Sequence, residues 1–300
     1  MGGFRKVDGI QHADSVPQHI LLATDLSSIS ALATQYATRL AVHAGAQFTI
    51  LYVFNPLRIN SRDSSGQEVT PEHLRVRDAL RLDALLASIR QHVPAAKALL
   101  MDGDPASVVI QAADRSDVDL IVTGSHSGHG LDRLLLGSTA EAIVRKSPCP
   151  VMTLGPNVTI GAEGMQPFDR ILCAMDFGDA AQSAAPVALK LAHQSGARVR
   201  FLHVLPSTLY GGVRKPVVEE LFDHAMHHLI ASTHLPAQAE CRVEYGTRIS
   251  SAILDDALLQ RADLIVLGVR RRCLLVSHLP AGIAFQVIAE SSCPVLTVSD

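Results

Sequence analysis

The sequence predicts an α/β fold of two tandem doubly wound domains, each a parallel sheet between helices. The first observation is a repeat, since the apolar run 19–25, which ends at Asp25, returns at 170–176, which ends at Asp176. The second is that short continuous apolar segments alternate with helical ones, a pattern typical of parallel strands buried on both faces. A unit of about 150 residues has the size of a domain rather than of a solenoid repeat.

The end of each copy repeats as well. Residues 119–124 and 263–268 share the pattern Asp-Leu-Ile-Val-x-Gly, and Cys-Pro-Val follows at 149–151 and at 293–295. Between the copies, 155–167 contains three glycines and two prolines, as an interdomain linker would. We therefore predict a first domain at 1–156, a linker at 157–167 and a second domain at 168–300.

The elements follow from the spacing of apolar residues. The first strand is expected at 20–23, and serines within 27–30 can cap a helix over 31–43 that Gly45 ends. Further strands are expected at 47–54, 98–101, 120–123 and 151–154, and further helices at 72–92, 107–115 and 134–146. In the second copy, strands are expected at 171–175, 198–205, 239–244, 264–267 and 295–298, and helices at 182–193, 216–232, 250–260 and 281–290. The polar stretch 55–71 is expected to be a loop that covers a site.

Composition excludes several classes of function. The chain has 300 residues, of which 48% are hydrophobic and 18% charged, as in a soluble globular protein. A net charge of −3 gives no basic field for nucleic acid or for an anionic membrane surface. No apolar run is long enough for a transmembrane helix, and the first residues do not resemble a signal peptide. Five cysteines without a Cys-x-x-Cys pair favour reduced thiols and a cytoplasmic location.

The segment 124–138 carries the chemistry of the first copy. It leaves a buried strand at Gly124, crosses a glycine-rich loop and meets a helix near Gly137 and Ser138. Glycines let backbone amides approach phosphate oxygens, and the N-terminus of a helix favours an anion. Asp25 ends the first strand and would share the same crevice, where its carboxylate can accept hydrogen bonds from ribose hydroxyls or from the adenine base.

With these motifs, each copy resembles the universal stress protein family, and the whole chain resembles its tandem form. The resemblance covers about residues 18–154 and 168–299. It implies an adenine-nucleotide α-hydrolase-like fold, with a five-stranded parallel sheet in the order 3-2-1-4-5. It also implies an intramolecular pseudo-dimer, in which the last strands, 151–154 and 295–298, pair antiparallel. A homodimer of whole chains stays open as an alternative.

The resemblance further implies ATP, with or without Mg²⁺, as the ligand of the first domain. ATP-binding members carry Gly, two residues, Gly, nine residues, Gly and then Ser or Thr. Here Gly124, Gly137 and Ser138 match this pattern, whereas Ser127 stands at the second glycine and Gly128 follows it. Val53 matches the position whose backbone meets adenine. The candidate binding residues are Ala23, Thr24, Asp25, Val53, Gly124, Ser125, Ser127, Gly128, Gly137, Ser138 and Thr139.

The second copy departs further from the pattern. Gly268 is followed by Val269 and by three arginines at 270–272, and no Gly-Ser pair precedes its last helix. Asp176 and Val204 are retained. We therefore expect a nucleotide in the first domain only, and we read Arg270, Arg271 and Arg272 as a solvated loop, with an anion site as the alternative.

Other motifs are weaker. There is no Gly-x4-Gly-Lys-Ser/Thr loop and no complete Gly-x-Gly-x-x-Gly, which excludes a P-loop enzyme and a Rossmann dinucleotide site. His224, His227 and His228 share one helix face, where a solvated surface is favoured over a metal site. His126 and His129 are read as polar loop residues rather than acid–base groups. Cys149 and Cys293 are read as small core residues rather than redox centres.

These observations lead to three hypotheses. The first is a stress-response regulatory protein that binds ATP in its first domain and signals through a protein partner whose identity the sequence does not give. The second is a scaffold, or a binder of another small ligand, with the same fold, which Ser127 and the altered second motif favour. The third is a slow ATPase, ranked last because no clear general base or metal-binding carboxylate accompanies the loop apart from Asp132. We assign no catalytic residue and no metal ligand.

Overall fold

The computed structural model contains one continuous ten-stranded sheet in the order β3-β2-β1-β4-β5-β10-β9-β6-β7-β8. The structure describes residues 17–28, 30–58, 70–125, 136–159, 168–207, 215–235, 238–270 and 282–300. The strands are β1 (His19–Thr24), β2 (Gln47–Phe54), β3 (Lys97–Asp102), β4 (Leu120–Gly124), β5 (Val151–Leu154), β6 (Arg170–Met175), β7 (Arg198–Pro206), β8 (Gln238–Gly246), β9 (Leu264–Val269) and β10 (Val295–Ser299). Each half of the sheet has the predicted order 3-2-1-4-5.

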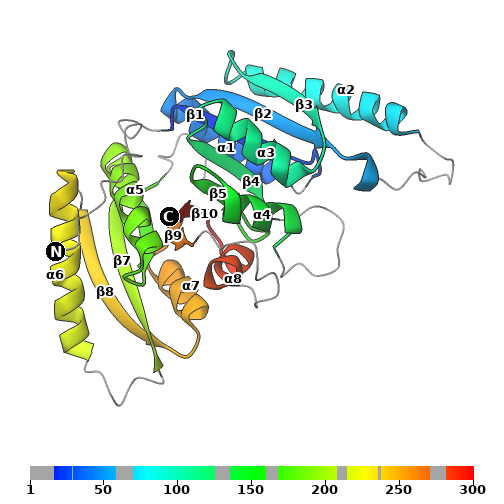
Figure 1. Ribbon diagram of the computed structural model, residues 1–300. Helices are drawn as coiled ribbons and strands as arrows, with labels where there is room; N and C mark the ends of the chain where they lie inside the picture. The colour runs from blue at the N-terminus through cyan, green and yellow to red at the C-terminus, as the bar shows by residue number, and fades with distance from the viewer. Residues whose placement is uncertain are drawn as a thin grey trace, which may run out of the picture.

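The two halves join through their last strands, as predicted. β5 and β10 are antiparallel, with Leu296 opposite Met152, whereas every other strand pairing is parallel. The antiparallel seam pairs two strands that would otherwise be open edges. We call residues 17–159 the first copy and residues 168–300 the second copy (Figure 1).

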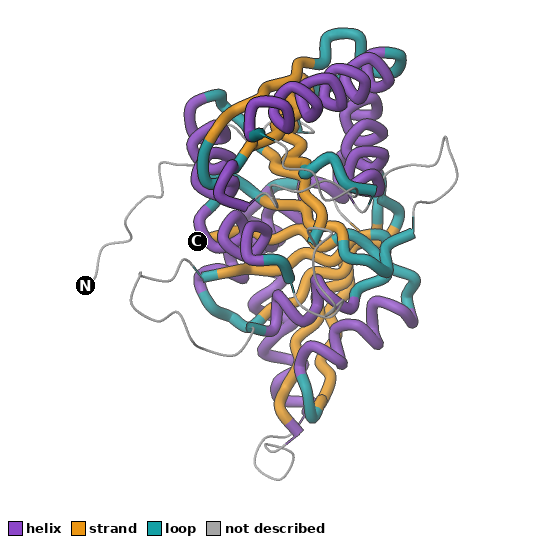
Figure 2. Tube along the Cα trace, turned by 90° about the vertical axis from the view of Figure 1, so that its right-hand side faces the viewer, coloured by secondary structure: helices purple, strands orange, loops and turns teal. Residues whose placement is uncertain are grey.

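Helices cover both faces of this sheet (Figure 2). They are α1 (Ser30–Ala44), α2 (Pro71–Arg90), α3 (Pro105–Arg115), α4 (Ser138–Lys146), α5 (Asp179–Ser195), α6 (Lys215–Thr233), α7 (Ile249–Leu259) and α8 (Ile283–Glu290), together with the short 3-10 helix η1 (Pro56–Arg58). One hydrophobic core contains residues of α1, α2, α5 and α6, and a second contains residues of α3, α4, α7 and α8. Each core therefore extends through both copies, on one face of the sheet.

The same kind of backbone contact explains why the motif Asp-Leu-Ile-Val-x-Gly occurs in both copies. The Asp119 carboxylate accepts from the backbone nitrogens of Gln18 (2.6 Å) and His19 (3.2 Å), just before and at the start of β1. Asp263 accepts in the same way from Asp169 and Arg170, both at 2.9 Å, at the start of β6. These aspartates fix the entry of each central strand, which makes them structural residues.

The Cys-Pro-Val motif is structural as well. Ser147 Oγ accepts from the backbone nitrogen of Cys149 (3.2 Å) and donates to its carbonyl oxygen (2.6 Å), and Ser291 makes the same two bonds with Cys293 (3.2 and 2.7 Å). Both thiols belong to the core or lie directly against it. This arrangement supports the prediction that Cys149 and Cys293 are core residues.

We expect both thiols to resist alkylation in the folded protein. Burial raises the pKa of Cys149 and of Cys293 to about 11 in each case. At pH 8 the reactive thiolate would then be on the order of 0.1% of each group. Iodoacetamide treatment followed by peptide mass mapping should find neither residue modified before unfolding and both modified in urea. Modification of either one in the folded chain would contradict the structural assignment.

The predicted element boundaries differ most at two helices. The last helix of the first copy begins at Ser138, with Gly137 as its N-cap, and not at Leu134. α5 begins at Asp179, three residues before the predicted start, because Gly178 caps it after a tight turn. Most of the polar stretch 55–71 and of the linker lies outside the described residues. No helix within the described residues is long and apolar enough to cross a membrane.

Candidate nucleotide site

The candidate site lies at the carboxyl edge of β1 and β4, where the strand order of the first copy reverses. β1 and β4 are parallel neighbours, and β4 pairs on its other side with β5. Open α/β sheets bind ligands at such reversal points, because the loops from the two strands diverge and leave a crevice. The base of the loop after β4 is closed by two bonds, from Ser125 N to the Leu154 oxygen (2.9 Å) and from Gly137 N to the Ser125 oxygen (2.8 Å).

The start of α4 presents backbone without a capping side chain. Its N-cap is Gly137, in extended conformation (φ −62°, ψ 143°), and no side chain of a described residue caps this terminus. Ser138 and Thr139 form the first turn. The acidic residue of that turn, Glu141, is paired with Arg145, whose Nη2 lies 2.8 Å from its carboxylate. The positive end of the helix therefore faces the loop that Gly124 opens.

Asp25 is exposed immediately after β1, in a turn built from short polar side chains. Its Oδ1 accepts from Ser27 N at 3.0 Å, and Thr24 Oγ1 accepts from Leu26 N at 3.0 Å. Leu26 has a φ of 58°, in the left-handed region that disfavours residues with a Cβ. The Thr24 hydroxyl also lies 3.0 Å from Ser30 Oγ at the start of α1. This turn aims the carboxylate outward, and no described residue donates to its second oxygen.

Most of the sequence-predicted residues do come together at this edge. Ala23 and Thr24 end β1 and Asp25 follows it, Gly124 ends β4 and Ser125 follows it, and Gly137 is the N-cap of α4, which begins with Ser138 and Thr139. Val53 lies near the end of β2, with its side chain buried. Ser127 and Gly128 lie outside the described residues, as do His126 and His129.

Gly124 has room around it. A Cβ built on Gly124 would lie 3.9 Å from the Ser30 Cα, an ordinary van der Waals distance. Among the described residues, then, nothing lies closer to this position than ordinary contact distance, whereas Ile29, the counterpart of Ala180 in the second copy, lies outside the described residues.

The matching position of the second copy is closed. A Cβ on Gly268 would overlap the carbonyl group of Ala180 and lie 2.5 Å from the Ala181 nitrogen, both in the first turn of α5. Arg270 follows β9 and reaches the turn after β6, where its Nη2 would lie 2.9 Å from a Cβ on Gly178. Backbone and side chain thus crowd this position of the second copy.

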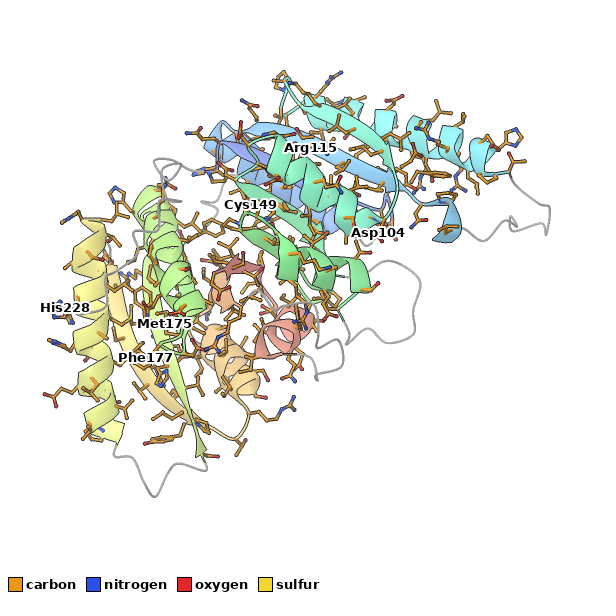
Figure 3. All side chains as sticks on the ribbon, viewed as in Figure 1. Asp104, Arg115, Cys149, Met175, Phe177 and His228 are labelled. Carbon is orange, nitrogen blue, oxygen red and sulfur yellow. The ribbon has the colours of Figure 1, made fainter. Side chains whose placement is uncertain are left out.

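Aromatic rings also fill the second copy's edge. Phe177, which like Leu26 has a positive φ (60°), follows Met175 and Asp176 at the end of β6 (Figure 3). Its ring packs edge-on against His203 and Phe222, with centroids 4.7 and 5.4 Å apart. The rings of His203 and Phe222 lie 5.6 Å apart.

The first copy has a polar network at the same place, which the sequence analysis missed. Asp78 on α2 is only 3% exposed and accepts from the Tyr52 hydroxyl at 2.7 Å. Arg77 and Arg81 also contact its Oδ1, at 2.9 and 3.5 Å. The detectable signal was an aspartate on the apolar stripe of a predicted helix, four residues from Leu74 and four from Leu82.

A groove of about 1520 Å³ begins at the turn after β1 and extends along α1. Thr24, Ser27 and Arg81 line its first-copy end, and Arg261 and Asp263 of the second copy line it farther on. Among the described candidate binding residues, Thr24 lines this groove, whereas Asp25, Gly124 and Gly137 do not.

The histidine face of α6 is engaged within its own helix. His227 Nδ1 lies 2.7 Å from the Asp223 carbonyl oxygen, and the rings of His224 and His228 pack edge-on at 4.6 Å. Figure 3 labels His228 on this helix, on its outer side. Among the described residues, no group of three or more His, Cys, Asp or Glu could hold a metal ion.

Known proteins share both the sequence pattern and the fold. The family model for the universal stress protein family matches residues 17–154 and 167–299. A universal stress protein of Thermus aquaticus is 31% identical over 133 residues, which cover 44% of this chain and 95% of the relative. Universal stress protein A homolog 1 of Coxiella burnetii is 31% identical over 140 residues, covering 46% and 95%.

A solved structure matches the whole tandem. A universal stress protein from Archaeoglobus fulgidus superposes with a TM-score of 0.72 at 22% identity, covering 94% of this chain and 96% of that one. This likeness confirms the predicted adenine-nucleotide α-hydrolase-like fold in its tandem form.

Proposed function

Because the chain belongs to the universal stress protein family, we propose that its first copy binds ATP and that occupancy regulates the binding of a protein partner in a stress response. The proposal rests on two features that follow the neighbouring strands β1 and β4. Asp25 is exposed after β1, and no side chain of a described residue caps the start of α4. The existence of a protein partner and the cytoplasmic location remain expectations from the sequence.

The phosphates suit the β4–α4 side of the crevice. Neither Gly124, at the end of β4, nor Gly137, at the N-cap of α4, places a side chain there. Backbone amides and the helix dipole favour a polyanion there, and the Ser138 hydroxyl adds a donor. ATP would bring its own charge-balancing Mg²⁺, so the chain need not supply a metal ligand.

The nucleoside suits the β1–β2 side. One Asp25 oxygen is used by the turn and the other faces outward, where a ribose hydroxyl could donate to it. The side chain of Val53 is buried, so only its backbone could contact a base. We propose no second nucleotide, because Gly268, Arg270 and the ring of Phe177 crowd the equivalent crevice.

The direct test is to identify what the purified protein carries. Heat denaturation followed by chromatography should release an adenine nucleotide, with ATP as the expected species. The midpoint temperature of thermal unfolding should also rise with millimolar Mg²⁺-ATP. A ligand that binds only the folded state stabilises it by about 2.7 kcal/mol at a hundred times its Kd. A solved universal stress protein is in complex with cAMP, so cAMP belongs in the same assay.

Two N-cap glycines provide a matched control. Gly137→Val should abolish both readouts, because a branched side chain would block the approach to α4. Gly282→Val places the same residue at the N-cap of α8 and should leave nucleotide binding intact. A protein that releases no nucleotide and shows no thermal shift would remove the proposal in favour of a scaffold. An ATPase would require phosphate release that scales with protein concentration and disappears in Gly137→Val.

A further inference from the structure

The turn that carries Asp25 is held from outside as well as from within. The Arg81 guanidinium on α2 donates to the carbonyl oxygen of Leu26, the residue in left-handed conformation. Thr24 and Asp25 supply the internal bonds of the turn, to Leu26 N and Ser27 N. Arg81 therefore supplies a hydrogen bond from another element to this residue, which also packs against the hydrophobic core.

Arg81 is itself positioned by a buried carboxylate. Its Nη1 lies 3.5 Å from Asp78 Oδ1, and Asp78 is almost completely buried. The Tyr52 hydroxyl donates to the other oxygen of Asp78 at 2.7 Å. Burial and the bond to Asp78 both raise the pKa of Tyr52, so its hydroxyl stays protonated and remains a donor across the physiological range.

This network joins the strands that would hold the nucleoside. Tyr52 lies directly opposite Thr24 in the β1–β2 register and immediately precedes Val53. The chain of contacts runs from the end of β2 through α2 to the turn after β1.

The second copy shows that the network is not a requirement of the fold. His203 and Phe222 stand where the first copy has Tyr52 and Asp78, and they pack ring against ring. The turn after β6 keeps its positive φ, but the Phe177 carbonyl accepts from Gln182 of α5 at 3.3 Å instead. The fold thus holds the same turn without a tyrosine–aspartate–arginine network of this kind, and the copy that does so is the one whose Gly268 position is crowded.

We infer that Tyr52, Asp78 and Arg81 are positioning residues for the proposed nucleotide site, which they serve by fixing the turn that aims Asp25. This inference rests on the proposed function, since its ligand is the same nucleotide. α2 thereby becomes part of the site, although none of the three side chains need touch the ligand.

The test compares two arginines on α2. Arg81→Met removes the hydrogen bond to the carbonyl oxygen of Leu26. Arg77→Met is the matched control, because Arg77 contacts the same Asp78 carboxylate at 2.9 Å, whereas the bond to Leu26 comes from Arg81. In the full chain, hydrogen exchange of the Leu26 and Ser27 amides should accelerate about tenfold in Arg81→Met, as expected for losing a bond from a charged donor. The change in Arg77→Met should stay below about twofold.

Nucleotide affinity supplies the readout that a merely structural role would not move. The Kd for Mg²⁺-ATP should rise about tenfold in Arg81→Met, whereas in an Asp25→Ala background the same change should add less than about twofold. Tyr52→Phe keeps the ring and removes the hydroxyl, so it should also accelerate amide exchange and raise the Kd. It is the variant to use if Arg81→Met does not fold.

Three results would overturn the inference: unchanged amide exchange in both Arg81→Met and Tyr52→Phe, equal effects of Arg77→Met and Arg81→Met, or full additivity with Asp25→Ala. Failure of the proposed function looks different, because the unmodified chain would then bind no nucleotide at all. The exchange comparison would still decide whether the network holds the turn.

Discussion

Gly268→Ala should destabilise the folded chain by at least about 3 kcal/mol, whereas Gly124→Ala should leave its stability within about 0.5 kcal/mol. The two glycines occupy the same position of the repeated motif. At Gly268 the added methyl would overlap backbone atoms of Ala180, which cannot move without shifting the start of α5. At Gly124 the nearest atom of a described residue would be the Ser30 Cα, 3.9 Å away.

Urea unfolding followed by circular dichroism measures both variants. Gly124→Ala should in addition weaken Mg²⁺-ATP binding, because its methyl would add bulk at the end of β4, where the proposed site lies. Equal stability losses in the two variants would show that the crevices are equally tight, and the contrast between the copies would then be wrong.

Asp256→Ala should cost about 3 kcal/mol or more of unfolding free energy. Asp256 on α7 is 3% exposed, and its Oδ1 accepts from Arg200 Nη1 at 3.0 Å. The Arg200 side chain is only 18% exposed, so removing Asp256 leaves a largely buried guanidinium with Glu240 as its remaining recorded ion-pair partner. Removing one partner of a buried ion pair costs more unfolding free energy than replacing both partners, because the remaining charge stays buried without its counter-charge.

The first copy supplies the design of the rescue. It has Thr49 and Ala112 at the positions of Arg200 and Asp256, and both are buried. The double variant Arg200→Thr with Asp256→Ala should therefore recover at least half of the loss, as measured by urea unfolding. As a control, Asp102→Ala breaks an exposed ion pair with Arg75 and should not shift the unfolding midpoint measurably. A double variant no more stable than Asp256→Ala would contradict this account.

Local patterns in the sequence were sufficient to predict the architecture. Continuous apolar strands and the repeat around Asp25 and Asp176 specified two parallel half-sheets, and the resemblance to the family specified their order and the β5–β10 seam. The site residues at strand ends were predictable for the same reason, since the carboxyl ends of neighbouring parallel strands meet at one edge.

What local patterns could not predict depends on contacts between distant segments. The bond from Arg81 to Leu26 joins residues 55 positions apart, and the Tyr52–Asp78 bond joins residues 26 apart. The closed crevice of the second copy depends on how closely α5 approaches Gly268, which the local sequence does not specify. The start of α5 was placed too late because Phe177, the residue with positive φ, is not a glycine, and Gly178 caps the helix without a side chain.

The most direct test of the central claim is the stoichiometry of ATP binding to the whole chain by isothermal titration calorimetry, with Asp25→Ala and Asp176→Ala as a matched pair. The two aspartates make the same turn bond, to Ser27 N and Gly178 N, at the ends of equivalent strands. The account predicts about one ATP per chain, with binding strongly weakened but still measurable in Asp25→Ala and unchanged in Asp176→Ala. Two equivalent sites, or a loss of binding in Asp176→Ala with Asp25→Ala unaffected, would contradict it.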